Sequence, residues 1–378
     1  MKRLYKIFLF SIIFLALPLS VSAQGKNANL AEKRYEGIVS SVKESKLITT
    51  DGPKRIYQKL EVQITNKNLK GKIIIIENGK VPVINSVEYG LGDKVVISAT
   101  RNSEGKEVFF ITDYVRRDSI YILFGIFVAV TILIGGVRGL ASLFGMVISF
   151  LVIFFIVLPL ILSGQDPILV AILSSLFIIP VNFYLSHGFN KKTTIAVAGT
   201  IFALILTGVL ANLFVNISHL SGFSSEDATF LETAKKGVIQ MKGLLLAGII
   251  IGALGVLDDI TISQAAIVFQ LKDTSQKLGI WALFSKAMDI GRDHIASMVN
   301  TLVLVYTGAS LPLLLLFVNT PLPFSEVISY ELIAEEIVRT LVVSIGLILA
   351  VPIVTFLSAV ACNLELKRAA KEILHSLK

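Results

Sequence analysis

The chain has 378 residues, of which 54% are hydrophobic and only 16% are charged. Soluble domains average roughly 45–50% apolar and about 25% charged residues, so this composition excludes an ordinary soluble protein. The net charge of +8 does not indicate nucleic-acid binding, because the basic residues are scattered and no basic helix or aromatic RNA-binding motif accompanies them. We expect the lipid bilayer, and no nucleic acid, to be the main partner.

The first 23 residues have the pattern of a signal peptide. Lys2, Arg3 and Lys6 form a basic start. The apolar segment Ile7–Leu19 and the small residues before a cleavage point after Ala23 complete the pattern. The alternative is that the segment stays uncleaved as an anchor. Both alternatives place the next segment outside the cytoplasm.

Residues 24–115 predict a small extracytoplasmic β-domain. Ile56–Thr65 alternates apolar and polar residues, and Ile73–Ile76 is typical of a buried strand. Asn78-Gly79 indicates a hairpin turn. Further strands follow the turns Gly92-Asp93 and Glu104-Gly105, at Lys94–Ala99 and Val108–Ile111. We expect about six or seven strands in an OB-like or similar small barrel.

The β-domain carries no visible catalytic cluster and no row of stacking aromatic residues. A ligand-binding face remains an alternative, but a scaffold or docking role is favoured. The expected partner of such a domain is another protein of the cell envelope.

From Ser119 onward the sequence predicts an all-α membrane bundle. A spanning helix needs about 20 mainly apolar residues, and about seven segments meet this requirement. They are Ser119–Val137, Leu140–Leu162, Ile168–Leu185, Thr194–Val215, a segment from Gly243 onward, Ile295–Val318 and Ile337–Cys362. The transmembrane domain therefore covers residues 116–362, and residues 363–378 form a basic cytoplasmic tail.

The basic residues agree with this topology, because cytoplasmic loops carry an excess of lysine and arginine. With the β-domain outside, the residues on the inside are Arg138, Lys191, Lys192, Lys272, Lys277, Lys286, Arg292, Lys367, Arg368, Lys371 and Lys378. Those on the outside are Arg116, Arg117, Lys235, Lys236, Lys242 and Arg339. We expect a multi-pass protein of the cytoplasmic membrane with its C-terminus inside.

The segment Gly243–Leu271 is apolar up to Leu257 and then carries Asp258 and Asp259. In one continuous helix, Asp259 would lie about 24 Å from Gly243, near the inner interface. In a broken or re-entrant helix, the two aspartates would lie deeper and face protein or water. The sequence alone leaves both geometries open.

An ionisable side chain inside the membrane costs about 2.5–3.5 kcal/mol on insertion scales, so the two aspartates are functional candidates. Adjacent carboxylates can exchange a proton, or can ligate a cation together with hydroxyls such as those of Thr261 and Ser263. Gln264 follows on the same helix. The competing interpretation is an acidic pair that caps the next helix.

Three glycines upstream form a small-residue pattern that predicts close helix packing. They are Gly248, Gly252 and Gly255.

A second constellation lies in Gly291–Phe317. Asp293, Ser297, and Asn300 or Thr301 fall on one face of a helix, and such a polar stripe needs partners on neighbouring helices. Arg292, Asp293 and His294 would lie at its cytoplasmic end, where His294 could relay protons or bind a metal. The competing interpretation is a capping cluster at the interface.

Several enzyme signatures are absent from the sequence. There is no Walker A loop, no HExxH and no GxSxG motif. Cys362 is the only cysteine, which excludes an intrachain disulfide and a zinc site built on several thiolates. We expect neither an enzyme nor a cofactor, and the sequence leaves metal binding undecided.

In these two constellations the sequence resembles the YibE/YibF-like family of bacterial membrane proteins. The matching residues are Leu246–Gly248, Gly252–Asp259, Thr261, Gln264–Ala265, Gly291–Ser297, Asn300–Leu302 and Gly308–Pro312. The resemblance implies a multi-pass fold in the bacterial cytoplasmic membrane and carries no activity with it. It also implies that the position of Asp258 can be Asn, which makes Asp259 the stronger functional candidate.

The leading hypothesis is a secondary transporter or ion-coupled permease. Its expected pathway or ion site comprises Asp258, Asp259, Thr261, Gln264, Arg292, Asp293, His294, Ser297, Asn300 and Thr301. The alternative is a non-catalytic assembly or sensor protein that acts through its β-domain, with a membrane-embedded enzyme third. Homo-oligomerisation is compatible with each hypothesis.

Overall fold

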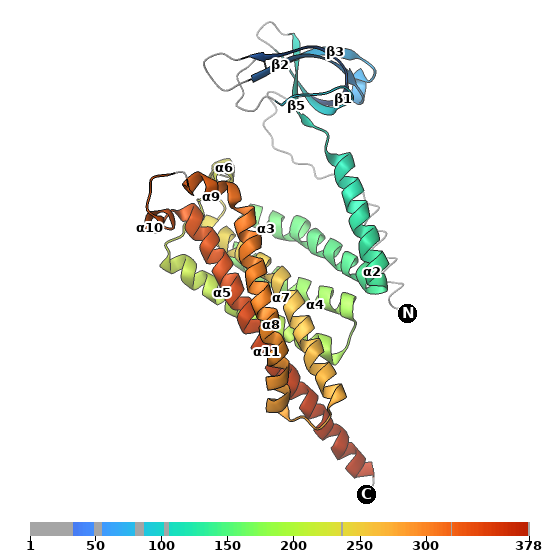
Figure 1. Cartoon of the computed structure of the whole chain (residues 1–378), viewed down its shortest axis with the longest axis vertical. Helices are drawn as coiled ribbons and strands as arrows, with labels where there is room; N and C mark the ends of the chain where they lie inside the picture. The colour runs from blue at the N-terminus through green and yellow to red at the C-terminus, as the bar shows by residue number, and fades with distance from the viewer. Residues whose placement is uncertain are drawn as a thin grey trace. The chain divides into compact units, whose positions relative to one another are not determined.

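The computed structural model describes residues 33–48, 55–79, 87–101, 106–235, 237–318 and 320–376, of which Arg55 and 365–376 are described by their backbone alone. Two compact units divide the chain, Met1–Ile126 and Phe127–Lys378 (Figure 1). The expected signal peptide lies outside the described residues.

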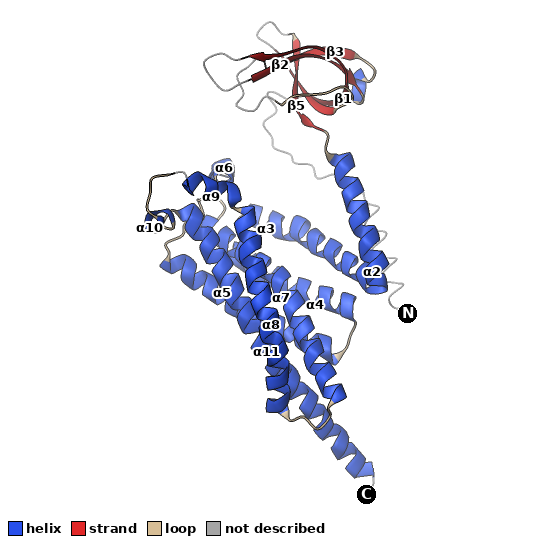
Figure 2. Cartoon of the chain, viewed as in Figure 1, coloured by secondary structure: helices blue, strands red, loops and turns tan. Residues whose placement is uncertain are grey.

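The first unit contains a five-stranded antiparallel sheet curled into a half-barrel (Figure 2). The strand order is β3-β2-β1-β4-β5, and the two outer strands, β3 and β5, contact each other. Two register shifts bend β1, as bulges do. The strands are β1 (Lys33–Ile48), β2 (Arg55–Ile64), β3 (Ile73–Asn78), β4 (Lys94–Arg101) and β5 (Glu107–Tyr114).

Alternating side chains build the core of the β-domain, because successive residues of a strand point to opposite faces. Leu60 and Val62 of β2 lie beside Val95 and Ile97 of β4 in one buried cluster. The buried amide of Gln58 donates to the carbonyl oxygen of Tyr89 (2.9 Å) and accepts from its N–H (2.8 Å). This pair ties the segment before β4 to the sheet.

The sheet corrects two expectations, on the number of strands and on the burial of Ile73–Ile76. Among the described residues there are five strands rather than six or seven. Ile73–Ile76 is not a fully buried run, because Ile73 and Ile75 are each 58% exposed while Ile74 and Ile76 are buried. The next described strand after Asn78-Gly79 is β4, which pairs with β1 and β5 instead of β3.

Residues 80–86, which would complete the hairpin expected at Asn78-Gly79, lie outside the described residues. The expected turn at Glu104-Gly105 lies outside them too. The strands expected at Lys94–Ala99 and Val108–Ile111 are confirmed within β4 and β5.

The second unit is helical. Among the residues that the structure describes, five helices are long and apolar enough to cross a membrane, or six if the bent pair α8–α9 counts as one span. The elements are α2 (Arg117–Val152), the π-helical turn η2 (Ile153–Val157), α3 (Leu158–Leu162), α4 (Pro167–His187), α5 (Lys191–Ile217), α6 (Glu226–Lys235), α7 (Met241–Thr274), α8 (Ile280–Ala309), α9 (Leu311–Val318), α10 (Phe324–Val327) and α11 (Glu331–Ser376).

Gly136 interrupts α2 with a non-helical backbone (φ 56°, ψ −138°). A side chain is disfavoured at such a positive φ. Just beyond the break, a Cβ on Gly139 would lie 2.3 Å from the carbonyl oxygen of Thr131, so the two segments of α2 approach closely there. The expected span Ser119–Val137 ends one residue after this break, and the expected span Leu140–Leu162 begins four residues after it.

The structure decides between the two geometries considered for the aspartate-bearing segment. The helix α7 runs unbroken from Met241 to Thr274, so the broken alternative is wrong. The break occurs instead between α8 and α9, which meet at 70°. Pro312 is the second residue of α9 and has no N–H, so it cannot donate the hydrogen bond to Gly308 that would continue α8. The expected span Ile295–Val318 is therefore bent.

The helix α7 is the centre of the bundle and contacts α4, α5, α8 and α11. The closest helix approaches rest on glycines of α5 and α11. A Cβ on Gly199 would lie 2.4 Å from Val354, and one on Gly346 would lie 2.0 Å from the hydroxyl of Thr207. Small residues at such positions let helix backbones pack tightly.

The glycine pattern of α7 does not serve this purpose among the described helices. A Cβ on Gly248 or Gly255 would meet nothing within 4 Å, and one on Gly252 would meet only the Tyr306 hydroxyl at 3.8 Å. The expected packing role of these three glycines is therefore not met in the described part of the chain.

We predict that Gly346→Ala lowers the free energy of unfolding by about 1–3 kcal/mol, the usual cost of overpacking, because the added methyl group overlaps the Thr207 side chain. Thermal unfolding of the purified full-length chain in detergent measures this. The control is Gly248→Ala, where the added methyl group meets open space. Equal melting temperatures for the two variants would contradict the packing described here.

Candidate functional site

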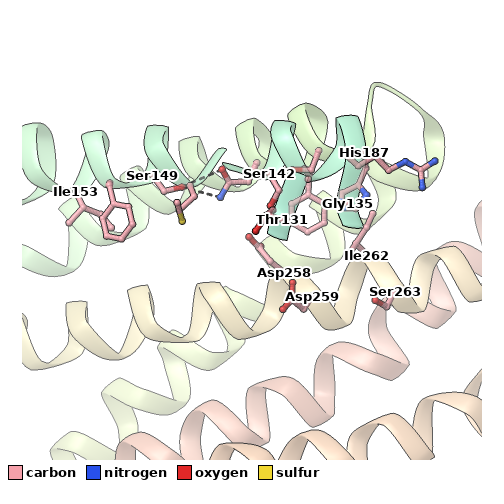
Figure 3. Close-up of a pocket in the computed structure, with 17 residues that line it drawn as sticks. Thr131, Gly135, Ser142, Ser149, Ile153, His187, Asp258, Asp259, Ile262 and Ser263 are labelled. Atoms are coloured by element: carbon pink, nitrogen blue, oxygen red, sulfur yellow. Dashed lines mark hydrogen bonds between the residues drawn. The ribbon is translucent and has the colours of Figure 1, made fainter. Parts of the chain in front are cut away.

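A cavity of about 840 Å³ lies among α2, α4 and α7 (Figure 3). Three segments far apart in the sequence supply its polar lining. These residues are Thr131, Arg138, Ser142, Ser149, Asn182, Ser186, His187, Asp258, Asp259 and Ser263. Two carboxylates, two basic side chains, hydroxyls and an amide thus face one space within an otherwise apolar bundle.

The helix α7 presents its part of the lining through helical periodicity. Asp258 and Ile262 are four residues apart, as are Asp259 and Ser263, so each pair shares a face of the helix. All four line the cavity. The last turns of α4 add His187, and the segment of α2 around Gly136 adds the remaining wall.

The carboxylate of Asp258 lacks a partner for one of its oxygens. In Figure 3, Asp258 extends from α7 toward Thr131 and Ser142. Its Oδ1 is buried and accepts no hydrogen bond from the described residues. Buried polar atoms are normally satisfied, and leaving a charge unpaired is costly. A proton, a cation or a donor group of a bound solute would meet this need.

Basic groups surround Asp259. His187 and His294 both interact electrostatically with its carboxylate. His187 in turn interacts with Arg138 and Lys192. The cavity therefore combines carboxylates on α7 with the imidazole of His187 at the end of α4 and the guanidinium of Arg138 on α2.

One wall of the cavity is held by a hydrogen-bonded pair. The amide nitrogen of Asn182 on α4 donates to the hydroxyl of Ser149 on α2 (3.0 Å), drawn as dashed lines in Figure 3. Gly145 permits this approach, because a Cβ there would lie 2.8 Å from the Asn182 side-chain oxygen. This contact positions the second segment of α2 against α4.

Two expected site residues of α7 lie in the helix interfaces instead of the cavity. Thr261 is fully buried, and its hydroxyl lies 2.6 Å from that of Thr200 on α5. The Gln264 amide donates to the hydroxyl of Thr355 on α11 (2.8 Å) and to the carbonyl oxygen of Ala287 on α8 (3.0 Å). These two residues hold α7 against three neighbouring helices.

The expected polar face of α8 also lies outside the cavity, and its residues Arg292, Asp293, Ser297, Asn300 and Thr301 are exposed. The Arg292 guanidinium pairs with Asp289 of the same helix at 2.7 Å. The Thr301 hydroxyl donates to the backbone oxygen of Ser297 (3.0 Å).

From the α8 face, His294 interacts electrostatically with Asp259 of α7. It is partly buried. The two constellations recognised in the sequence also meet where Gly291 packs against Gln264, because a Cβ on Gly291 would lie 3.0 Å from the amide nitrogen of that side chain.

Sequence reasoning missed part of the lining. Ser142 and Ser186 were not singled out, Arg138 was interpreted only as a topology signal, and His187 lies just beyond the expected span Ile168–Leu185. The available signal was the presence of polar side chains within or beside apolar segments, including Asn182. Polar residues within apolar segments do not indicate which helices pack around a common cavity.

The polar side chains of the cavity are better suited to bind hard cations or hydrogen-bonding solutes than a transition metal. Among the residues that the structure describes, no three or more His, Cys, Asp or Glu side chains are arranged to hold a metal ion. The two aspartates instead share the cavity with hydroxyls and an amide, which are ligands suited to hard cations or to hydrogen-bonding solutes.

We predict that Gln264→Leu lowers the free energy of unfolding by about 1–3 kcal/mol, because it removes the two buried hydrogen bonds that the Gln264 amide donates to Ala287 and Thr355 on neighbouring helices. The matched control is Gln270→Leu, an exposed glutamine of the same helix. Thermal unfolding in detergent compares the two. Equal stability of both variants would show that the Gln264 contacts do not hold the bundle together.

Comparison with known families adds an independent finding. The family model described as YibE/F-like protein matches residues 123–364, which is more than half of the chain and includes the cavity and the α8 face. Comparisons with curated proteins and with solved structures gave no match. The resemblance found in the sequence is thereby confirmed, and the chain belongs to the YibE/F-like protein family.

Proposed function

We propose that this protein is an integral membrane transporter or ion-coupled permease that carries a small hydrophilic solute or ion through the cavity among α2, α4 and α7. The observation that carries the proposal is the pair Asp258 and Asp259 in this cavity, on a 34-residue apolar helix at the centre of the bundle. Ionisable residues in such helices mark substrate or proton pathways.

We further propose seven spans in the cytoplasmic membrane. The stretch Arg117–Leu162 has 46 residues and would be about 69 Å long as one helix, whereas the apolar core of a bilayer is about 30 Å thick. Division at Gly136 into two spans resolves this mismatch. With the bent pair α8–α9 as one further span, the total agrees with the sequence expectation.

The β-domain would lie outside the membrane, and residues 363–378 inside. Contact between β3 and β5 supports an OB-like arrangement, in which the curled sheet closes toward a barrel. The excess of basic residues in the proposed cytoplasmic loops supports the same orientation.

Two irregular points in the helices beside the cavity suit an alternating-access cycle. Gly136 breaks α2 within the cavity wall, and the π-helical turn η2 begins at Ile153, which also lines the cavity. π-Helical turns often occur at functional sites. Neutralisation of Asp258 by a proton or cation would lower the cost of closing α2 over α7.

Hydrogen bonds connect the start of α11 with the segment that follows the end of α5. The Glu331 Oε1 accepts from the N–H (2.5 Å) and hydroxyl (2.7 Å) of Ser221 and from the N–H of Gly222 (3.1 Å). Arg339 bridges Glu335 and Glu336 at 2.7 and 2.8 Å. The Glu331 contacts hold the start of α11 against the segment that follows α5, whereas the Arg339 pairs lie within α11.

A second candidate function is envelope assembly or sensing through the β-domain. The observation that favours it is the exposure of Ile73 and Ile75 on the outer strand β3. A protein partner that covered this strand would bury both side chains. This reading requires no solute pathway.

Solvent access at position 259 tests the pathway. In a Cys362→Ser background, we expect Asp259→Cys to react with a membrane-impermeant thiol reagent at a rate that changes with a proton or sodium gradient. The matched control is Asp273→Cys, an exposed position further along α7 and outside the cavity lining. Gradient-independent labelling at both positions would favour a helix cap at the interface over a pathway.

Ion flux tests the carboxylates directly. In liposomes loaded with a pH- or sodium-sensitive dye, we expect Asp259→Asn to reduce gradient-driven flux to the level of protein-free liposomes, because the charged group in the cavity is lost. Asp273→Asn should retain wild-type flux. Undiminished flux in Asp259→Asn would reject Asp259 as a pathway residue, and wild-type flux no greater than that of protein-free liposomes would reject transport of the ion tested.

Deletion of residues 24–115 separates the two candidate functions. Transport predicts that flux persists without the β-domain. The assembly function predicts that this deletion, and not Asp259→Asn, abolishes the protein's role in the cell.

A further inference from the structure

A second hollow of about 350 Å³ lies between α4 and α5, with α7 as its floor. Ile172 and Leu176 form one wall, Ile205 and Val209 form the other, and Ile250 lies beneath. The four wall residues are 37–60% exposed, so the hollow is a groove that opens sideways. Asn212 is the only polar residue in its lining.

Gly208 gives the groove its depth. It lines the hollow, and a Cβ at this position would reach only Ile250, at 3.8 Å. This is an ordinary contact, so close packing does not require a glycine here. Without a side chain at 208, the wall of α5 recedes and the floor of α7 stays accessible.

A positively charged group is connected to the polar end of the groove. The Asn216 amide nitrogen donates to the side-chain oxygen of Asn212 (3.1 Å). The Lys242 ammonium donates to the side-chain oxygen of Asn216 (2.8 Å). Because the Asn216 amide is neutral, this hydrogen bond does not compensate the positive charge of the Lys242 ammonium.

The dimensions of the groove fit one leaflet of a bilayer. Its lining on α5 runs from Ile201 to Asn212, about 17 Å along a helix, and half of a hydrocarbon core is about 15 Å. The polar end lies near the end of α5 and the start of α7. Those helix ends are where headgroups would be, if both helices span the membrane.

We propose that this groove binds one acyl chain of an anionic phospholipid, with the phosphate at Lys242 and Asn216. The apolar walls match a hydrocarbon chain, and the ammonium matches a phosphate. A helix of a second copy is about 10–12 Å across, which is too wide for a hollow of this size. The inference rests on the membrane placement proposed above and does not depend on transport.

Native mass spectrometry of the full-length chain, purified in detergent, tests the proposal. The probes are phosphatidylglycerol and phosphatidylethanolamine with identical acyl chains. We expect the wild-type protein to retain phosphatidylglycerol several-fold more than phosphatidylethanolamine. Lys242→Gln should remove this preference, and the control Lys235→Gln, at a lysine on α6 outside the groove, should preserve it.

Filling the groove supplies a second, independent readout. Gly208→Leu should reduce retention of both lipids at this site, whereas Leu213→Phe, an exposed position of α5 outside the lining, should leave retention unchanged. If Gly208→Leu does not fold, Val209→Trp fills the same wall. Melting temperatures identify folded variants, so a folding defect is not mistaken for lost binding.

Three outcomes would overturn the proposal. They are equal retention of the two lipids by the wild-type protein, displacement of bound lipid by excess inorganic phosphate, and a lipid-free dimer in which a second copy occupies the groove. Lipid retention and liposome flux are measured independently. A failure of the lipid proposal can therefore be distinguished from a failure of the transport proposal.

Discussion

The cost of placing two adjacent carboxylates on a central apolar helix is the constraint on which the rest of the helical unit depends. Four helices pack against α7, so most of its surface must be apolar. Asp258 and Asp259 can therefore face only a polar space. The Gly136 break and the Ser149–Asn182 contact place α2 and α4 around that space. The cavity follows from the need to accommodate these charges.

The other faces of α7 use polar groups differently. Thr261 and Gln264 point into the helix interfaces. Thr261 forms a hydrogen bond with α5, and Gln264 forms hydrogen bonds with α8 and α11. Such contacts fix the rotation of α7, since a turn of the helix would bury the carboxylates and expose the amide. Some polar residues of α7 thus hold neighbouring helices in place, whereas others line the cavity.

The two proposed binding sites also lie at different positions along the same helices. The polar cavity involves the last turns of α4 and the middle of α7, whereas the apolar groove involves the beginning of both helices. A solute or ion is suited to the first and a lipid chain to the second. Their separation allows each to be altered by mutation without direct disturbance of the other.

The sequence by itself determined the class of the protein, because long apolar segments and short alternating strands are local patterns. It also identified Asp258 and Asp259 through the cost of charge among apolar residues. Only the tertiary structure decided that α7 is continuous, that Gln264 lies in an interface, and that Ser142 and His187 share a cavity with the aspartates. Helical periodicity defines the face of a residue, but the partner of that face depends on packing between segments distant in the chain.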